Sequence, residues 1–210
     1  MHHDLLNPAG IVKGYTEILS DMEEDEKKSQ YLQIIERNNE KLINIIDRAS
    51  KFAKLHSVKE IKFKTMDIGV IFKEVIGNFM PKIDEKQMIL EFNANSRYCS
   101  NVNPVIEEVF SNLLSNAIKY SPEKSRIIID IMDAGEEWRV EVTDFGEGIS
   151  DEDKSKLFER FRRANRKNVK GTGLGLAIVK RLITLHGGSV GVEDNPERQG
   201  SRFWVTVKKA

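Results

Sequence analysis

The period of the hydrophobic pattern changes near residue 58, and this change limits the folds that the chain can adopt. Up to residue 57, apolar residues recur at alternating spacings of three and four, which is the pattern of an amphipathic helix. Beyond residue 60, short alternating runs typical of strands are interleaved with further helical patterns. The pattern therefore predicts an α+β chain with two domains, 1–57 and 58–210.

Residues 1–57 are predicted to form an antiparallel helical hairpin, with the polar stretch 20–29 forming or flanking the turn. Its apolar stripe includes Ile11, Tyr15, Ile18, Met22, Tyr31, Ile34, Leu42, Ile45 and Phe52. Two helices cannot enclose a stripe this wide, so we expect a homodimer in which two hairpins make a four-helix bundle. The alternative is a monomer in which the hairpin packs against the second domain.

Residues 58–210 are predicted to form an α/β sandwich, in which helices cover one face of a single sheet. We expect a short strand at 61–66, a helix at 68–79 and a second helix that ends near Tyr120. A strand pair around Gly135, a helix at 174–186 and two closing strands complete the pattern. The Walker-type GxxxxGK[ST] loop is absent, so a nucleotide site here would be of another kind.

The composition argues against a nucleic-acid or membrane partner for this segment. Basic and acidic residues balance at 33 each, so no global field favours either surface. The single Cys99 excludes an intrachain disulfide and suits a reducing compartment. No apolar run approaches the roughly 18 residues that cross a bilayer. We expect a cytoplasmic location, and the abrupt start inside a helix suggests the cytoplasmic part of a longer or membrane-anchored protein.

Polar residues at the end of the helix near Tyr120 are candidates for binding a nucleotide. Asn112 and Asn116 lie four apart, on one helical face, and Lys119 and Tyr120 follow within a turn. Amide oxygens suit Mg²⁺, which also bridges substrate phosphates. Lys119 can meet a phosphate and Tyr120 can cover a base or ribose. The alternative is a solvated helix end.

Two glycine-rich motifs follow. Asp144 ends a predicted strand, and Gly146 and Gly148 permit a tight turn and close approach to a flat ring. A carboxylate that accepts from an exocyclic amine selects adenine over guanine. The second motif, Gly171-Thr172-Gly173-Leu174-Gly175, leads into a helix whose N–H groups can bind phosphate. The basic stretch before it, which includes Arg160 and Arg163, could form a cationic lid. An ordinary turn and a solvated loop are the alternatives.

The chain begins with His3-Asp4-Leu-Leu-Asn7-Pro8 at the start of a helical pattern. A neutral imidazole is nucleophilic near neutral pH, and Asp4 could hold or take the proton of the opposite ring nitrogen. The alternative is a surface histidine near a chain start.

Together these motifs resemble the H box, N box, first glycine box, F box (Phe158-Glu159-Arg160-Phe161) and second glycine box of sensor histidine kinases. That family uses the Bergerat-type ATP-binding fold of DNA gyrase, certain chaperones and mismatch-repair proteins, and the resemblance covers residues 60–210 almost fully. It implies a kinase that uses ATP and Mg²⁺ to phosphorylate His3 and then a response-regulator receiver domain.

The resemblance also implies a role for each residue. Asn116 is the expected Mg²⁺ ligand with Asn112 supporting it, and Asp144 the expected partner of the adenine amine. Lys119 and Tyr120 are expected to contact nucleotide, as are the residues of both glycine motifs. Arg160 or Arg163 is expected to reach the γ-phosphate. Asn7 implies phosphatase activity toward the regulator. His2 stands where a serine is more usual and Leu6 where a basic residue is frequent, but Asp4 and Asn7 set the register on His3.

Two other classes of function remain open. An ATPase of the gyrase or chaperone type carries a glutamate four residues before the metal asparagine, where this chain has Asn112, and Glu108 lies eight before Asn116. A non-enzymatic module that binds ATP as a structural ligand is the other alternative. Labelling of His3 separates it from a kinase.

Overall fold

The computed structural model describes residues 2–58, 61–159 and 173–210, with the backbone alone for residues 2–5 and 56. The chain divides into two compact units, residues 1–57 and 58–210. A helical hairpin is followed by an α/β unit, so the predicted α+β class is confirmed. Within the described ranges, no helix has the length and apolar character needed to cross a membrane.

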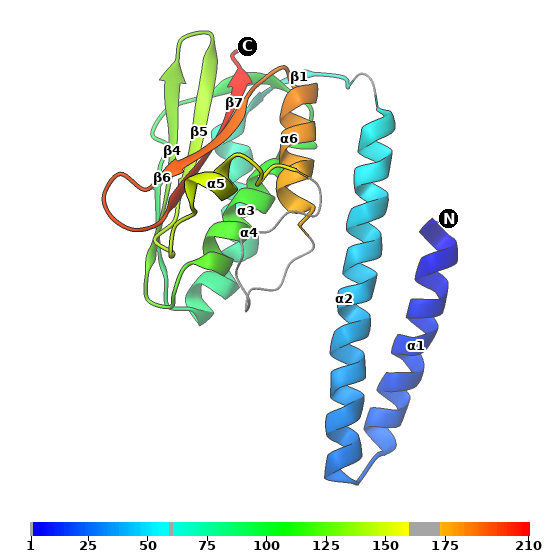
Figure 1. Ribbon diagram of the computed structural model, residues 1–210. Helices are drawn as coiled ribbons and strands as arrows, with labels where there is room; N and C mark the ends of the chain where they lie inside the picture. The colour runs from blue at the N-terminus through cyan, green and yellow to red at the C-terminus, as the bar shows by residue number, and fades with distance from the viewer. Residues whose placement is uncertain (1, 59–60, 160–172) are drawn as a thin grey trace. The chain divides into compact units, whose positions relative to one another are not determined.

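The first unit consists of α1 (His2–Met22) and α2 (Glu26–Ser57), which pack side by side along the hairpin (Figure 1). Asp25 starts α2, since its Oδ1 accepts hydrogen bonds from the N–H groups of Lys27 at 2.9 Å and Lys28 at 3.1 Å. A carboxylate in this position satisfies donors that have no partner inside the helix. The polar stretch 20–29 therefore both forms the turn and begins the second helix.

The hairpin buries small and polar residues and leaves its large apolar residues exposed. Ala9, Thr16 and Asn39 are buried, and Asn39 Nδ2 donates to the carbonyl of Ala9 at 2.7 Å. In contrast, large apolar side chains on both helices are between 43% and 75% exposed: Ile11, Val12, Tyr15, Ile18, Leu19, Met22, Tyr31, Ile34, Ile35, Leu42 and Ile45. Large apolar side chains exposed in this number are unusual for a protein surface and are typical of interaction sites.

The second unit contains a five-stranded sheet in the order β2-β4-β5-β7-β6. The β2–β4 pair is parallel and the other pairs are antiparallel. The strands are β2 (Ile89–Asn93), β4 (Arg126–Ala134), β5 (Glu137–Thr143), β6 (Val190–Asp194) and β7 (Ser201–Lys208). A separate two-stranded sheet joins β1 (Lys64–Asp67) to β3 (Cys99–Val102).

The register divides the five-stranded sheet into an apolar face and a polar face. Ile129 pairs with Val142, which pairs with Phe203, and all three are buried. Side chains alternate across a strand, so the intervening residues lie on the opposite face. There Arg139 Nε lies 2.6 Å from Glu141 Oε1. The apolar face is therefore the one that receives the helices.

Three helices cover the apolar face: α3 (Ile68–Glu85), α4 (Ile106–Tyr120) and α6 (Gly175–Leu185) (Figure 1). A short helix, α5 (Asp151–Lys154), lies in the connection after β5. Between α3 and α4, the rings of Phe72 and Phe110 stack with centroids 4.6 Å apart and an interplanar angle of 1°. This arrangement agrees with the predicted sandwich.

Several predicted boundaries were wrong. The helix from Ile68 was expected to end at residue 79, but it continues past Pro81 to Glu85 because Ile83 is almost fully buried. The strand expected at 61–66 covers Lys64–Asp67 instead. Helix α5 was not predicted, since four polar residues carry no helical period. In α3 the burial of Ile83 accompanies the extra turn, whereas α5 is started locally by Ser150, whose Oγ accepts from the N–H of Asp153 at 3.2 Å.

Candidate functional site

Helix α4 presents the predicted asparagines on a half-buried side. Leu113, Leu114, Ala117 and Ile118 are buried, so the amphipathic pattern turns Asn112 and Asn116 away from the core. Asn112 Nδ2 donates to the carbonyl of Glu108 at 2.8 Å. This bond uses the nitrogen, so Oδ1 is the atom that Asn112 can direct toward a ligand or a neighbouring amide.

A cation and an aromatic ring meet at the C-terminal end of α4. Lys119 Nζ lies 4.7 Å from the centroid of the Tyr120 ring and 3.4 Å from its hydroxyl. Attraction between the cation and the ring holds the two side chains together. The last turn of α4 therefore offers a positive charge beside a flat surface, both half-buried.

Asp144 lies directly after β5 and is buried, with 4% of its surface exposed. Its Oδ1 accepts from the N–H of Gly146 at 2.9 Å and from the N–H of Ser201 at 3.2 Å. Its own N–H donates to the carbonyl of Ser201 at 2.8 Å. Two N–H groups that donate to Oδ1 keep the carboxylate from rotating about its side-chain bond, and this also sets the direction in which Oδ2 points.

The glycines around Asp144 are required by close backbone contacts. A Cβ on Gly146 would lie 2.5 Å from the carbonyl oxygen of Tyr120, so the end of α4 and the turn after β5 lie against each other. Gly148 has a φ of +79°, which glycine adopts without strain. The structure thus brings together two predicted motifs, the one that ends at Tyr120 and the one that begins at Asp144.

The second glycine motif is described only from residue 173. Gly173 has a φ of +70°, Leu174 is buried, and α6 begins at Gly175. The first N–H groups of any helix have no carbonyl partner inside it and favour an anion. Helices α4 and α6 pack against each other, so this helix start belongs to the same layer as the asparagines.

Several other predicted site residues lie wholly or partly outside the described part of the chain. Arg160, Arg163, Gly171 and Thr172 lie outside the described residues. His3 and Asp4 belong to α1, but their side chains also lie outside the description. Asn7 is exposed on α1. The roles assigned to all the site residues stay predictions.

The sequence interpretation missed the connection between β6 and β7. This connection, residues 195–200, contacts the Asp144 turn through backbone and side-chain bonds. Asn195 Nδ2 donates to the carbonyl of Asp144 at 2.9 Å, and Gln199 Nε2 donates to the carbonyl of Glu147 at 2.9 Å. Only Pro196 and Gly200 marked the segment, and they indicate a turn without naming what it contacts.

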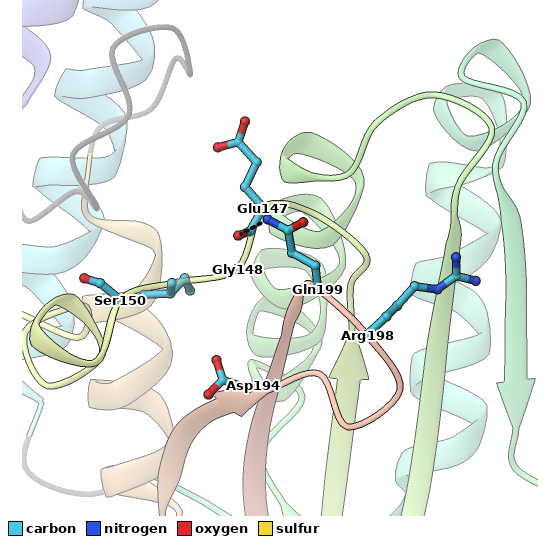
Figure 2. A pocket seen from close by; sticks show the side chains of 8 residues that line it. Glu147, Gly148, Ser150, Asp194, Arg198 and Gln199 are labelled. Atoms are coloured by element: carbon cyan, nitrogen blue, oxygen red, sulfur yellow. Dashed lines mark hydrogen bonds between the residues drawn. The ribbon is translucent and has the colours of Figure 1, made fainter.

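A cavity of about 410 Å³ lies between the 147–150 segment and the β6–β7 connection (Figure 2). Of the predicted site residues, it includes Gly148. Among the described residues, no group of three or more His, Cys, Asp and Glu side chains could hold a metal ion.

Two family models match the chain. Residues 1–57 match the His Kinase A (phospho-acceptor) domain, and residues 101–210 match the histidine kinase-, DNA gyrase B- and HSP90-like ATPase family. The second match covers more than half of the chain.

Curated relatives and solved structures agree with these matches. The sensor histidine kinase YcbM of Bacillus subtilis (strain 168) is 30% identical over 217 residues, covering 100% of this chain and 70% of that protein. The sensor protein GacS of Pseudomonas syringae pv. syringae is 30% identical over 222 residues, covering 99% of this chain and 24% of its own length. The chain thus spans about a quarter of GacS.

A catalytic-domain structure of the histidine kinase ThkA is 29% identical with a TM-score of 0.64, covering 71% of this chain and 99% of that one. A structure of full-length ShkA in complex with AMPPNP has a TM-score of 0.81 at 24% identity, covering 100% of this chain and 45% of that one, and it supports the fold. Since YcbM matches over the whole of this chain and the ATPase family model matches more than half of it, the chain belongs to the sensor histidine kinases of two-component systems.

Proposed function

We propose that this chain is an ATP-dependent protein-histidine kinase, which phosphorylates its own His3 and passes the phosphoryl group to an aspartate of a response-regulator receiver domain. The observation that carries the proposal is the contact between the end of α4 and the Asp144 turn. It supports the proposal because the helix that carries the two asparagines and Lys119 ends against the turn that carries the buried Asp144.

Each group has a distinct task toward ATP. Asp144 accepts from the exocyclic amine of adenine, and the half-buried ring of Tyr120 covers the base or ribose. Lys119 neutralises phosphate charge, and the start of α6 binds phosphate oxygens through backbone N–H groups. Asn116, supported by Asn112, would hold Mg²⁺, which supplies charge neutralisation on the phosphates.

His3 is the proposed nucleophile. One imidazole nitrogen attacks the γ-phosphorus, an N–P bond forms, and the bond from the γ-phosphorus to the bridging oxygen of ADP breaks. Asp4 orients the ring and receives the proton that the imidazole gives up. Phosphoryl transfer depends mainly on alignment and charge neutralisation, so no additional covalent group is required.

Incubation of the purified chain with γ-labelled ATP and Mg²⁺ tests the proposal. We expect an acid-labile, alkali-stable label, as phosphohistidine gives, and its loss in His3→Gln and in Asn116→Ala. His2→Gln and Asn38→Ala are matched controls, since Asn38 is an exposed asparagine on α2. Label that persists in His3→Gln contradicts the acceptor, and ATP binding without any label favours a binding module.

We also propose that the hairpin forms a homodimer. The support is its row of exposed apolar residues, which a second hairpin would cover in a four-helix bundle. Ile18→Asp and Ile45→Asp place charges on this surface and should give a monomer in light scattering. Lys54→Asp, on an exposed position of α2, should leave the dimer intact.

The regulator-facing activity includes dephosphorylation. Asn7 is exposed one turn beyond His3, where its amide could orient a water on an aspartyl phosphate. Asn7→Ala should therefore lose phosphatase activity and keep autophosphorylation. Unchanged dephosphorylation in that variant argues against the role.

A further inference from the structure

The β6–β7 connection is held against the Asp144 turn by two side-chain amides that no motif of the nucleotide site includes. Asn195 is buried, with 6% of its surface exposed, and its Nδ2 donates to the carbonyl of Asp144. Its Oδ1 accepts from the N–H of Glu197 at 2.9 Å. A carbonyl can only accept and an N–H can only donate, so the orientation of this amide is set by chemistry.

The backbone of Asn195 also joins the two ends of the β6–β7 connection. Its N–H donates to the carbonyl of Gly200 at 3.2 Å, which brings the two ends of residues 195–200 together. Gly200 has a φ of +144°, and a Cβ there would lie 2.1 Å from the carbonyl oxygen of Asp144. The next residue, Ser201, donates its N–H to Asp144 Oδ1. The bonds of Asn195 therefore hold the segment that orients the carboxylate.

The second side-chain amide is that of Gln199, further along the same connection. Gln199 Nε2 donates to the carbonyl of Glu147, and Figure 2 shows this bond between two residues that line the cavity. The Gln199 side chain is exposed, whereas that of Asn195 is buried. Loss of a buried donor leaves an unsatisfied carbonyl, while loss of an exposed donor is compensated by water. Asn195 is therefore the stronger of the two contacts.

We infer that Asn195, assisted by Gln199, is a positioning residue that sets base specificity by aiming the Asp144 carboxylate at the exocyclic amine of adenine. The inference rests on the proposed function, and it adds residues from the β6–β7 connection to the determinants of nucleotide choice. Asn195 acts through Asp144 and does not itself contact the nucleotide.

Binding of ADP, and of purine riboside 5′-diphosphate, which lacks the 6-amino group, tests the inference on the full chain with Mg²⁺ by calorimetry. Asn195→Asp keeps the acceptor for Glu197 and removes the donor to Asp144. We expect it to bind ADP about tenfold more weakly and the analogue with unchanged affinity. Gln199→Glu should weaken ADP binding about twofold, again without an effect on the analogue.

Asp194→Asn is the matched control, because Asp194 precedes the same connection and bonds with Lys154 at 2.7 Å. It should bind both ligands as the unchanged chain does. Equal weakening of both ligands in Asn195→Asp, or no weakening in either variant, overturns the inference. If Asn195→Asp does not fold, Gln199→Glu decides. Failure of the unchanged chain to bind ADP refutes the proposed function itself, and the inference with it.

Discussion

Acidification should destabilise the second unit through His186, which is buried at the end of α6. Its Nε2 accepts from the N–H of Asn103 at 3.1 Å, so the ring proton must lie on Nδ1, which donates to the carbonyl of Leu182 at 2.7 Å. A second proton, on Nε2, would point at the N–H of Asn103, so that two donors would face each other. Burial lowers the pKa of His186 below its ordinary value.

The sign and size of the effect follow from proton linkage. Because the folded pKa is depressed, the unfolded chain binds the proton first as the pH falls below about 6.5, and the free energy of unfolding then decreases. At about pH 5.5 a histidine in the unfolded chain is mostly protonated. If His186 stays neutral in the folded protein, the free energy of unfolding is therefore lower at about pH 5.5 than at about pH 7.5 by at most about 1.4 kcal/mol. Above about pH 7.5 the contribution changes little.

Urea unfolding followed by tryptophan fluorescence measures this loss. Both tryptophans, Trp138 and Trp204, lie in strands of the second unit, so the signal reports on that unit. His186→Gln keeps an acceptor for Asn103 but does not titrate, and it should lose about 1 kcal/mol less between the two pH values. Equal losses in the two proteins would refute the reasoning, since all the other titratable groups are shared.

Three further changes test the packing. Phe72→Ala, which removes the ring stacked on Phe110, should lower the free energy of unfolding by about 3 to 5 kcal/mol in urea, and a loss below about 1 kcal/mol contradicts the burial. Gly146→Ala would force a Cβ against Tyr120, so it should weaken nucleotide binding at least tenfold in calorimetry, and near-normal affinity argues against the contact. Asn39→Ala should cost the hairpin about 1 to 3 kcal/mol by circular dichroism, whereas a neutral result means that its buried amide bond contributes nothing.

The division of the chain into a helical unit and a mixed unit could be predicted from the sequence, because apolar residues recur with a different period in helices and in strands. The amphipathic period of α4 separates Asn112 and Asn116 from the buried Leu113 and Leu114, and this separation needs only local geometry. The end of α3 was mispredicted: the helix continues past Pro81 to Glu85, and Ile83 in this last turn is buried.

The sequence by itself determined the family, the order of the motifs and the residue types that suit ATP, since these depend on local spacing and on the chemistry of each side chain. Only the tertiary structure decided which groups hold Asp144 in place. Ser201 and Asn195 lie 57 and 51 residues away from it along the chain, and sheet pairing between β5, β7 and β6 brings them into contact. Such contacts arise from strand register and from the close approach of distant backbone segments, and the local periodicity of a sequence does not predict them.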